Sequence, residues 1–183
     1  VHRKTMKGFK LFPGLATDEE CQSIIDSCKR APDDRLQNRW EIKEFEIPET
    51  LKEKAQKCLG DEKIIAERVQ CYFEGDSFSA HRDAIWLSMP KHGVAKEIWK
   101  RDRNLSMSIV LNDEYQGGDL IIEGERVPAK KGDGVLFSAM ALHWVEGIWE
   151  GCRMSVAVWS GTWDFKKITP EQMREFCDKQ DNL

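Results

Sequence analysis

Apolar residues recur at helical spacing in two places within the first third of the chain. Residues 17–20 read Thr-Asp-Glu-Glu, which has the form of a capping box, and the apolar positions that follow lie three and four residues apart. We therefore expect an amphipathic helix over residues 18–30. The same spacing between Pro48 and Gly60 predicts a second helix of about three turns, and residues 40–47 look extended.

From residue 64 onward the apolar residues form short or alternating runs separated by Gly, Asp and Pro. These runs lie at 64–65, 69–73, 106–111, 120–122, 134–137 and 154–159. Many short strands with turn residues and no helical pattern between them are typical of a sandwich, jelly roll or barrel rather than of a parallel α/β sheet. The helix start at Thr169-Pro170 predicts a short C-terminal helix.

The length of 183 residues favours a single domain with one core. We expect residues 1–63 to provide helical support and edge strands, residues 64–165 to form the β core, and residues 166–183 to hold the C-terminal helix.

Charge and composition narrow the functional classes. The formal net charge of −4 disfavours general binding of nucleic acid, which needs a basic surface. The six cysteines are scattered without a C-x-x-C pair, which favours reduced thiols over a zinc ribbon or a disulfide framework. No apolar run approaches the roughly 18 residues of a membrane span, and the first residues lack the apolar core of a signal peptide. We expect a cytoplasmic protein with neither a membrane nor a nucleic-acid partner.

His81 and Asp83 are candidate ligands of one metal ion. Side chains two residues apart in a strand point to the same face, with Cα atoms about 6.5 Å apart, which suits an imidazole and a carboxylate on one ion. Alone, the pair is better explained as solvated residues at a strand end. His143 follows a predicted strand that can return beside the first one, and it supplies a third candidate; His2 and His92, in a terminus and a polar loop, are poorer candidates.

Two histidines and one carboxylate with open positions are the ligand set of non-haem Fe(II) oxygenases, although a zinc hydrolase could use the same three. Arg153 and Ser155 help to discriminate between these enzymes. They share one face of a mostly apolar strand, where a guanidinium and a hydroxyl could bind a carboxylate beside the metal. The alternative is an arginine at a strand end that faces solvent.

The order of these motifs resembles that of the iron- and 2-oxoglutarate-dependent dioxygenases of the prolyl 4-hydroxylase type. The resemblance covers about half of the chain. The chain departs from it at two positions: Val110 stands where animal oxygen-sensing members carry Tyr, and Arg153 stands where many collagen-type members carry Lys. In chain order the matching segments are Tyr72-x-x-Gly75-x-x-Phe78-x-x-His81-x-Asp83, Arg103-Asn104-Leu105-Ser106 with Leu111-Asn112, Tyr115-x-Gly117-Gly118-Asp119-Leu120, Lys131-Gly132-Asp133 to Phe137, His143, Arg153 and Trp159.

The resemblance implies a mainly β protein, with a double-stranded β-helix of the jelly-roll or cupin-like kind packed on N-terminal helices. It implies that the metal ligands and catalytic residues are His81, Asp83 and His143, and that Arg153, Ser155 and Tyr72 bind the cosubstrate. The implied cofactors are Fe(II), 2-oxoglutarate and O2, with ascorbate as a candidate reductant. Such enzymes decarboxylate 2-oxoglutarate to succinate while they hydroxylate a substrate.

The expected substrate is a prolyl residue in a peptide or protein, because Tyr72, Arg103 and Trp159 match residues that surround the target proline in relatives. Trp86 and Trp99, in the long connection after Asp83, could clamp a peptide, and the lysines there leave an acidic peptide or a nucleic-acid strand as alternatives. The same chemistry on a free amino acid, another small molecule or nucleic acid also stays open. So does a non-catalytic, cupin-like metal-binding module.

Overall fold

The computed structural model describes residues 8–29, 35–36, 39–83 and 102–162. Within them lie two helices, α1 (Asp18–Ser27) and α2 (Glu49–Leu59). The strands are β1 (Phe9–Phe12), β2 (Arg35–Leu36), β3 (Arg39–Ile42), β4 (Ile64–Phe73), β5 (Phe78–His81), β6 (Asp102–Val110), β7 (Tyr115–Gly117), β8 (Leu120–Ile122), β9 (Glu125–Arg126), β10 (Gly134–Ser138), β11 (His143–Val145) and β12 (Ile148–Thr162).

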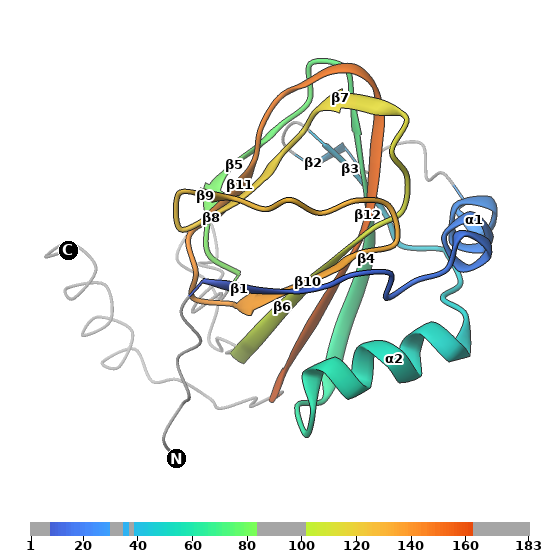
Figure 1. The fold of residues 1–183 in the computed structure, drawn as a ribbon, viewed down its shortest axis with the longest axis vertical. Helices are drawn as coiled ribbons and strands as arrows, with labels where there is room; N and C mark the ends of the chain where they lie inside the picture. Colours follow the sequence, from blue (N-terminus) through green and yellow to red (C-terminus); the bar gives the residue numbers. More distant parts are fainter. Residues whose placement is uncertain (1–7, 30–34, 37–38, 84–101, 163–183) are drawn as a thin grey trace, which may run out of the picture.

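Two antiparallel sheets form the body of the protein. The eight-stranded sheet has the order β1-β10-β6-β12-β4-β3-β2, with β7 added beside β12, and the four-stranded sheet has the order β5-β11-β8-β9. In Figure 1 the small sheet lies to the left of the large one and both helices lie to the right. The predicted mainly β, jelly-roll architecture with N-terminal supporting helices is confirmed.

Both predicted helices form, and local chemistry explains where they begin and end. The Thr17 hydroxyl accepts the Glu20 backbone N–H at 3.2 Å, while the Glu20 carboxylate accepts the Thr17 N–H at 2.9 Å, so the predicted capping box is present. Glu20 also pairs with Lys54 of α2 at 2.8 Å, which ties the two helices together. The second helix ends before Gly60, whose φ of 67° suits glycine.

Strand alternation divides the large sheet into two faces. Along β12, Val156 and Val158 point to the core shared with α1 and α2, whereas Arg153 and Ala157 point toward the small sheet. A second apolar cluster, which includes Tyr72 and residues of β8, β10 and β11, fills the space between the sheets. The space between the two sheets is therefore where polar side chains can meet on a buried surface.

Some predicted elements differ in extent. Helix α1 ends at Ser27 rather than at residue 30, and the two apolar runs at 64–65 and 69–73 belong to one continuous strand, β4. Strand β3 ends at Ile42, so only part of the predicted extended segment 40–47 is a strand. The predicted C-terminal helix lies outside the described residues.

None of the helices in the described part of the chain is long and apolar enough to cross a membrane. The cysteines at positions 21, 28, 58, 71 and 152 form no disulfide within the described residues.

Candidate metal centre and cosubstrate pocket

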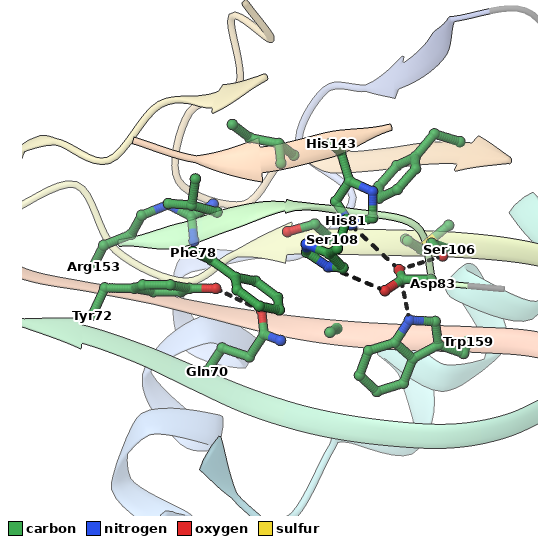
Figure 2. Close-up of a pocket in the computed structure, with 15 residues that line it drawn as sticks. Gln70, Tyr72, Phe78, His81, Asp83, Ser106, Ser108, His143, Arg153 and Trp159 are labelled. Atoms are coloured by element: carbon green, nitrogen blue, oxygen red, sulfur yellow. Dashed lines mark hydrogen bonds and ion pairs between the residues drawn. The ribbon is translucent and has the colours of Figure 1, made fainter. Parts of the chain in front are cut away.

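A pocket of about 400 Å³, its open mouth included, lies between the two sheets. Asp83 and Trp159 lie toward one end, and Arg153 and Tyr72 lie toward the other (Figure 2). The side chains that line it come from both sheets: Gln70, Tyr72, Phe78, His81, Asp83, Ser106, Met107, Ser108, Leu120, Phe137, His143, Val145, Arg153, Ala157 and Trp159.

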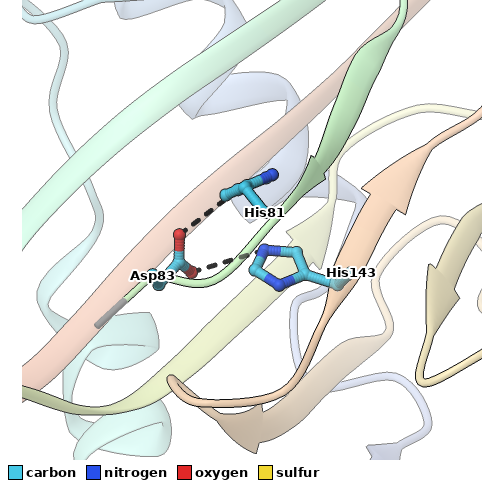
Figure 3. Close-up of side chains that lie close together, drawn as sticks. All are labelled: His81, Asp83 and His143. Atoms are coloured by element: carbon cyan, nitrogen blue, oxygen red, sulfur yellow. Dashed lines mark ion pairs between the residues drawn. The ribbon is translucent and has the colours of Figure 1, made fainter. Parts of the chain in front are cut away.

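The register of the small sheet brings the three candidate metal ligands together. Strands β5 and β11 are antiparallel, and His81 lies directly opposite His143. Asp83 follows β5 by two residues, and its carboxylate lies 3.4 Å from His81 Nε2 and 3.5 Å from His143 Nε2 (Figure 3). One ligand atom from each residue lies within 4.8 Å of the others, a spacing that one metal ion can bridge.

Backbone hydrogen bonds fix the tautomer of both histidines. The Nδ1 atom of His81 lies 2.8 Å from the Ser79 carbonyl, and Nδ1 of His143 lies 3.0 Å from the Ala141 carbonyl. A carbonyl only accepts, so Nδ1 carries the proton and Nε2 keeps its lone pair toward Asp83, as in metal-binding histidines. Burial lowers the pKa of His143 although the Asp83 charge opposes this shift, which favours the neutral, metal-binding form.

Asp83 is buried and held by two donors from the large sheet. Ser106 Oγ and Trp159 Nε1 donate to the same carboxylate oxygen, at 2.7 and 2.9 Å. Burial by itself raises the pKa of Asp83, but its neighbours, which include the Ser106 and Trp159 donors, hold that pKa well below its usual range. The side chain is therefore an oriented carboxylate, as a hard divalent cation requires.

Arg153 carries a buried hydrogen-bond donor that has no acceptor among the described residues. Its side chain is 2% exposed, so the alternative of a solvent-facing arginine does not hold. Nη1 donates to the Ser155 hydroxyl at 3.1 Å, which confirms that the two residues share a face, whereas Nε has no hydrogen-bond partner within the described ranges. Because an unpaired buried N–H is costly, this arrangement suits an anionic ligand such as a carboxylate.

Gly118 makes room for the Arg153 side chain. Its φ is 68°, and a Cβ added there would lie 2.2 Å from Ile148 Cδ1 and 3.0 Å from Arg153 Cδ. A larger residue would therefore displace the guanidinium. The sequence predicted Arg153 at the start of a strand, but it lies inside the 15-residue strand β12, opposite Tyr72 of β4.

Tyr72 is fully buried beside Arg153, whose guanidinium carbon lies 5.5 Å from the centre of the Tyr72 ring. Its hydroxyl donates to Gln70 Oε1 at 3.2 Å. Burial raises the pKa of Tyr72 to about 12, with the charge of Arg153 acting in the opposite direction. The phenol therefore stays protonated and can donate one hydrogen bond.

Arg103 and Trp159 contact each other and the candidate metal centre. The Arg103 guanidinium carbon lies 4.0 Å from the centre of the Trp159 ring, and Nη1 lies 3.9 Å from the Asp83 carboxylate. The sequence predicts substrate contacts for both residues and no role for Ser106. The support of Asp83 by Trp159 and Ser106 is not predicted by the sequence, because that contact depends on strand register. Trp86 and Trp99 lie outside the described residues.

Comparisons with known proteins agree with this geometry. A hydroxylase of the PKHD type from Saccharophagus degradans is 34% identical over 103 residues, which are 53% of this chain and 43% of that protein. A PKHD-type hydroxylase from Rippkaea orientalis is 24% identical over 171 residues, 79% of this chain and 74% of that protein. The chain thus spans about half the length of several curated relatives that it matches.

Solved structures share the fold. The viral collagen prolyl hydroxylase of Paramecium bursaria Chlorella virus-1 superposes with a TM-score of 0.61 at 16% identity, over 85% of this chain and 97% of that chain. A prolyl-4-hydroxylase of Pseudomonas putida gives a TM-score of 0.53 at 17% identity, over 84% of this chain and 91% of that chain. These likenesses identify the two-sheet body as the double-stranded β-helix of such oxygenases.

The sequence profile of the 2OG-Fe(II) oxygenase superfamily matches residues 68–161, about half of the chain. This matched part contains the three candidate metal ligands and the buried Arg153. The chain therefore belongs to the 2OG-Fe(II) oxygenase superfamily.

Proposed function

We propose that the protein is an Fe(II)- and 2-oxoglutarate-dependent hydroxylase that acts on a prolyl residue in a peptide or protein. One observation carries the proposal: a single pocket has a three-residue metal-binding cluster toward one end and a buried arginine with an unpaired N–H toward the other. A dicarboxylate that binds the metal through one end and an arginine through the other matches this pocket.

In this proposal His81, Asp83 and His143 hold Fe(II). Both imidazoles offer a lone pair on Nε2, and Asp83 is anionic, so these residues fit a divalent ion and leave coordination positions open. When bound, iron and 2-oxoglutarate supply the activation of O2 that couples decarboxylation of the cosubstrate to hydroxylation of the substrate. The contribution of Ser106 and Trp159 is to keep the carboxylate of Asp83 in one orientation.

Arg153 and Ser155 bind the distal carboxylate of 2-oxoglutarate. The unpaired Nε–H of Arg153 gains an acceptor, and the Ser155 hydroxyl, now an acceptor from Nη1, can donate its own proton to the carboxylate. Tyr72 contributes a neutral phenol beside the guanidinium, which can turn from Gln70 to the ligand. A non-catalytic metal-binding module would have no use for this buried anion site, which favours the enzyme.

Trp159 and Arg103 support a prolyl substrate. An aromatic face suits the pyrrolidine ring, and a guanidinium beside it suits a peptide carbonyl. Among proteins with a similar fold is a prolyl hydroxylase from Trichoplax adhaerens solved with a hypoxia inducible factor peptide fragment, with a TM-score of 0.51. We propose a peptide or protein substrate for this chain as well.

The test is to incubate the purified protein with Fe(II), 2-oxoglutarate and ascorbate, and to follow succinate formation and the mass of proline-containing peptides. We expect succinate and a peptide gain of one oxygen atom, both abolished in His143→Ala. Succinate formation with hydroxylation of a free amino acid but of no peptide would refute the substrate class. No succinate from a correctly folded, metal-loaded protein would refute the enzyme itself.

A further inference from the structure

Arg82, the residue between the candidate ligands His81 and Asp83, points away from the pocket and reaches two other segments. Its side chain is 50% exposed. Nη1 donates to the backbone carbonyl of Met140 and lies 3.6 Å from Glu123 Oε1. The backbone that carries two of the candidate metal ligands is thereby linked to the β8–β9 turn and to the loop before β11.

Glu123 completes the connection to the third candidate ligand. Its Oε1 accepts the backbone N–H of Leu142 at 2.5 Å, and its own N–H donates to the Leu142 carbonyl at 2.8 Å. Leu142 directly precedes His143. One carboxylate oxygen therefore joins Arg82, from the segment of His81 and Asp83, to the backbone beside His143.

Glu123 holds this position in a backbone conformation that disfavours it. Ile122 pairs with Glu125, so residues 123 and 124 form a two-residue hairpin turn, with φ of 50° for Glu123 and 82° for Gly124. Positive φ at both positions is the feature of turns that prefer Asn, Asp or Gly. Glu123 is the only non-glycine residue with positive φ in the described part of the chain, and such outliers often mark functional positions.

The backbone pairing that brings the ligands together is short. In the described structure β5 has four residues and pairs only with β11, which has three, and their register shifts between His143 and Val145. Few ladder hydrogen bonds therefore fix His81 and Asp83 relative to His143. A side-chain connection across the same segments adds a constraint that the ladder does not supply.

We propose that Arg82, Glu123 and the backbone of Met140 and Leu142 form a clamp that sets the separation of the metal ligands. Arg82 and Glu123 are positioning residues in this clamp, since neither belongs to the candidate ligand cluster or lines the pocket. The inference rests on the proposed ligands His81, Asp83 and His143. The clamp keeps the cluster in its binding geometry before the ion arrives, so the protein does not have to order it on binding.

The decisive variant is Glu123→Asn. Asn suits the left-handed turn better than Glu, but its side chain is one carbon shorter and cannot serve both Arg82 and the Leu142 N–H. We expect the metal-free variant to unfold at the wild-type temperature or above it. Its dissociation constant for Mn(II), measured by calorimetry on metal-stripped protein, should rise about tenfold, at the lower end of what outer residues of metal sites contribute.

Arg82→Met should weaken Mn(II) binding to a similar extent. Glu123→Gln keeps the acceptor for the Leu142 N–H but loses the charge, so its Mn(II) affinity should lie between those of wild type and Glu123→Asn. Arg126→Met is the matched control. Arg126 belongs to the same small sheet and pairs with Asp119 at 3.1 Å and Glu146 at 3.6 Å, beyond the other end of β11. The Arg126→Met variant should bind Mn(II) with the affinity of wild type.

Three results would overturn the clamp. If Glu123→Asn and Arg82→Met both bind Mn(II) within twofold of wild type and of the control, the contacts do not position the ligands. If affinity falls only in proportion to a lower unfolding temperature, the residues are merely structural. A wild-type protein that binds no Mn(II) contradicts the proposed metal ligands themselves, and the clamp with them.

Discussion

Replacing Trp159 by Phe separates two roles that this residue combines. The indole N–H donates to the buried Asp83 carboxylate at 2.9 Å, while the ring lies against the Arg103 guanidinium. Phenylalanine keeps an aromatic face for a pyrrolidine ring but cannot donate to Asp83. The variant therefore removes support from the candidate metal centre and leaves most of the proposed substrate contact.

The magnitude follows from the environment of Asp83. A hydrogen bond to a charged group contributes about 1.5 to 3 kcal/mol, and each 1.4 kcal/mol is tenfold in a binding constant. Ser106 still donates to the same oxygen at 2.7 Å, so the loss should lie near the lower limit. We expect Mn(II) affinity to fall about tenfold in Trp159→Phe, and again by a similar factor when Ser106→Ala is added.

The assay is calorimetric titration with Mn(II), followed by succinate formation at saturating metal with and without peptide. Trp159→Phe at saturating metal should keep a peptide KM close to wild type. Trp159→Ala should lose metal affinity and, in addition, produce succinate without hydroxylated peptide, because the ring that orients the substrate is gone. Wild-type Mn(II) affinity in Trp159→Phe would refute the role assigned to the indole N–H.

Five further substitutions test other parts of the site. His81→Ala and Asp83→Glu should each abolish succinate formation, since three ligands hold the ion and an added methylene displaces the carboxylate oxygen; full activity in either would remove that residue from the metal site. Arg153→Lys should raise the KM for 2-oxoglutarate less than Arg153→Ala does, and an equal effect would argue against a charge contact. Gly118→Ala should lower the free energy of denaturant unfolding by about 1 to 3 kcal/mol and raise the KM for 2-oxoglutarate, because the added Cβ would meet Ile148 and the Arg153 side chain. An unchanged unfolding free energy together with an unchanged KM would contradict this close packing.

The candidate metal ligands could be predicted from the sequence because their chemistry follows simple periodicity. His81 and Asp83 are two residues apart, and His143 follows a strand that an antiparallel fold can return to the first. The structure adds the direct pairing of His81 with His143, which no local pattern specifies. The shared face of Arg153 and Ser155 follows from the same alternation, and the hydrogen bond between their side chains confirms it.

Contacts that depend on register between distant strands could not be predicted. Ser106 and Trp159 are 23 and 76 residues from Asp83 in sequence, and they meet it only because β6 and β12 are neighbours in the large sheet. The apolar pattern also predicts a shorter strand than β12, because Gly151 and Cys152 interrupt the apolar run before Arg153. The unusual turn at Glu123 needs backbone dihedral angles that a sequence pattern does not supply.

The most direct test of a shared metal and cosubstrate pocket is calorimetric titration of 2-oxoglutarate into the Mn(II)-loaded protein, the metal-free protein and Mn(II)-loaded Arg153→Ala. We expect 2-oxoglutarate to bind tightly to the Mn(II)-loaded protein and much more weakly to the metal-free protein. In Arg153→Ala its binding free energy should be weaker by about 3 to 5 kcal/mol, while Mn(II) affinity should equal that of wild type. Equal 2-oxoglutarate affinity in all three samples would contradict a ligand held between the His81-Asp83-His143 cluster and the buried arginine.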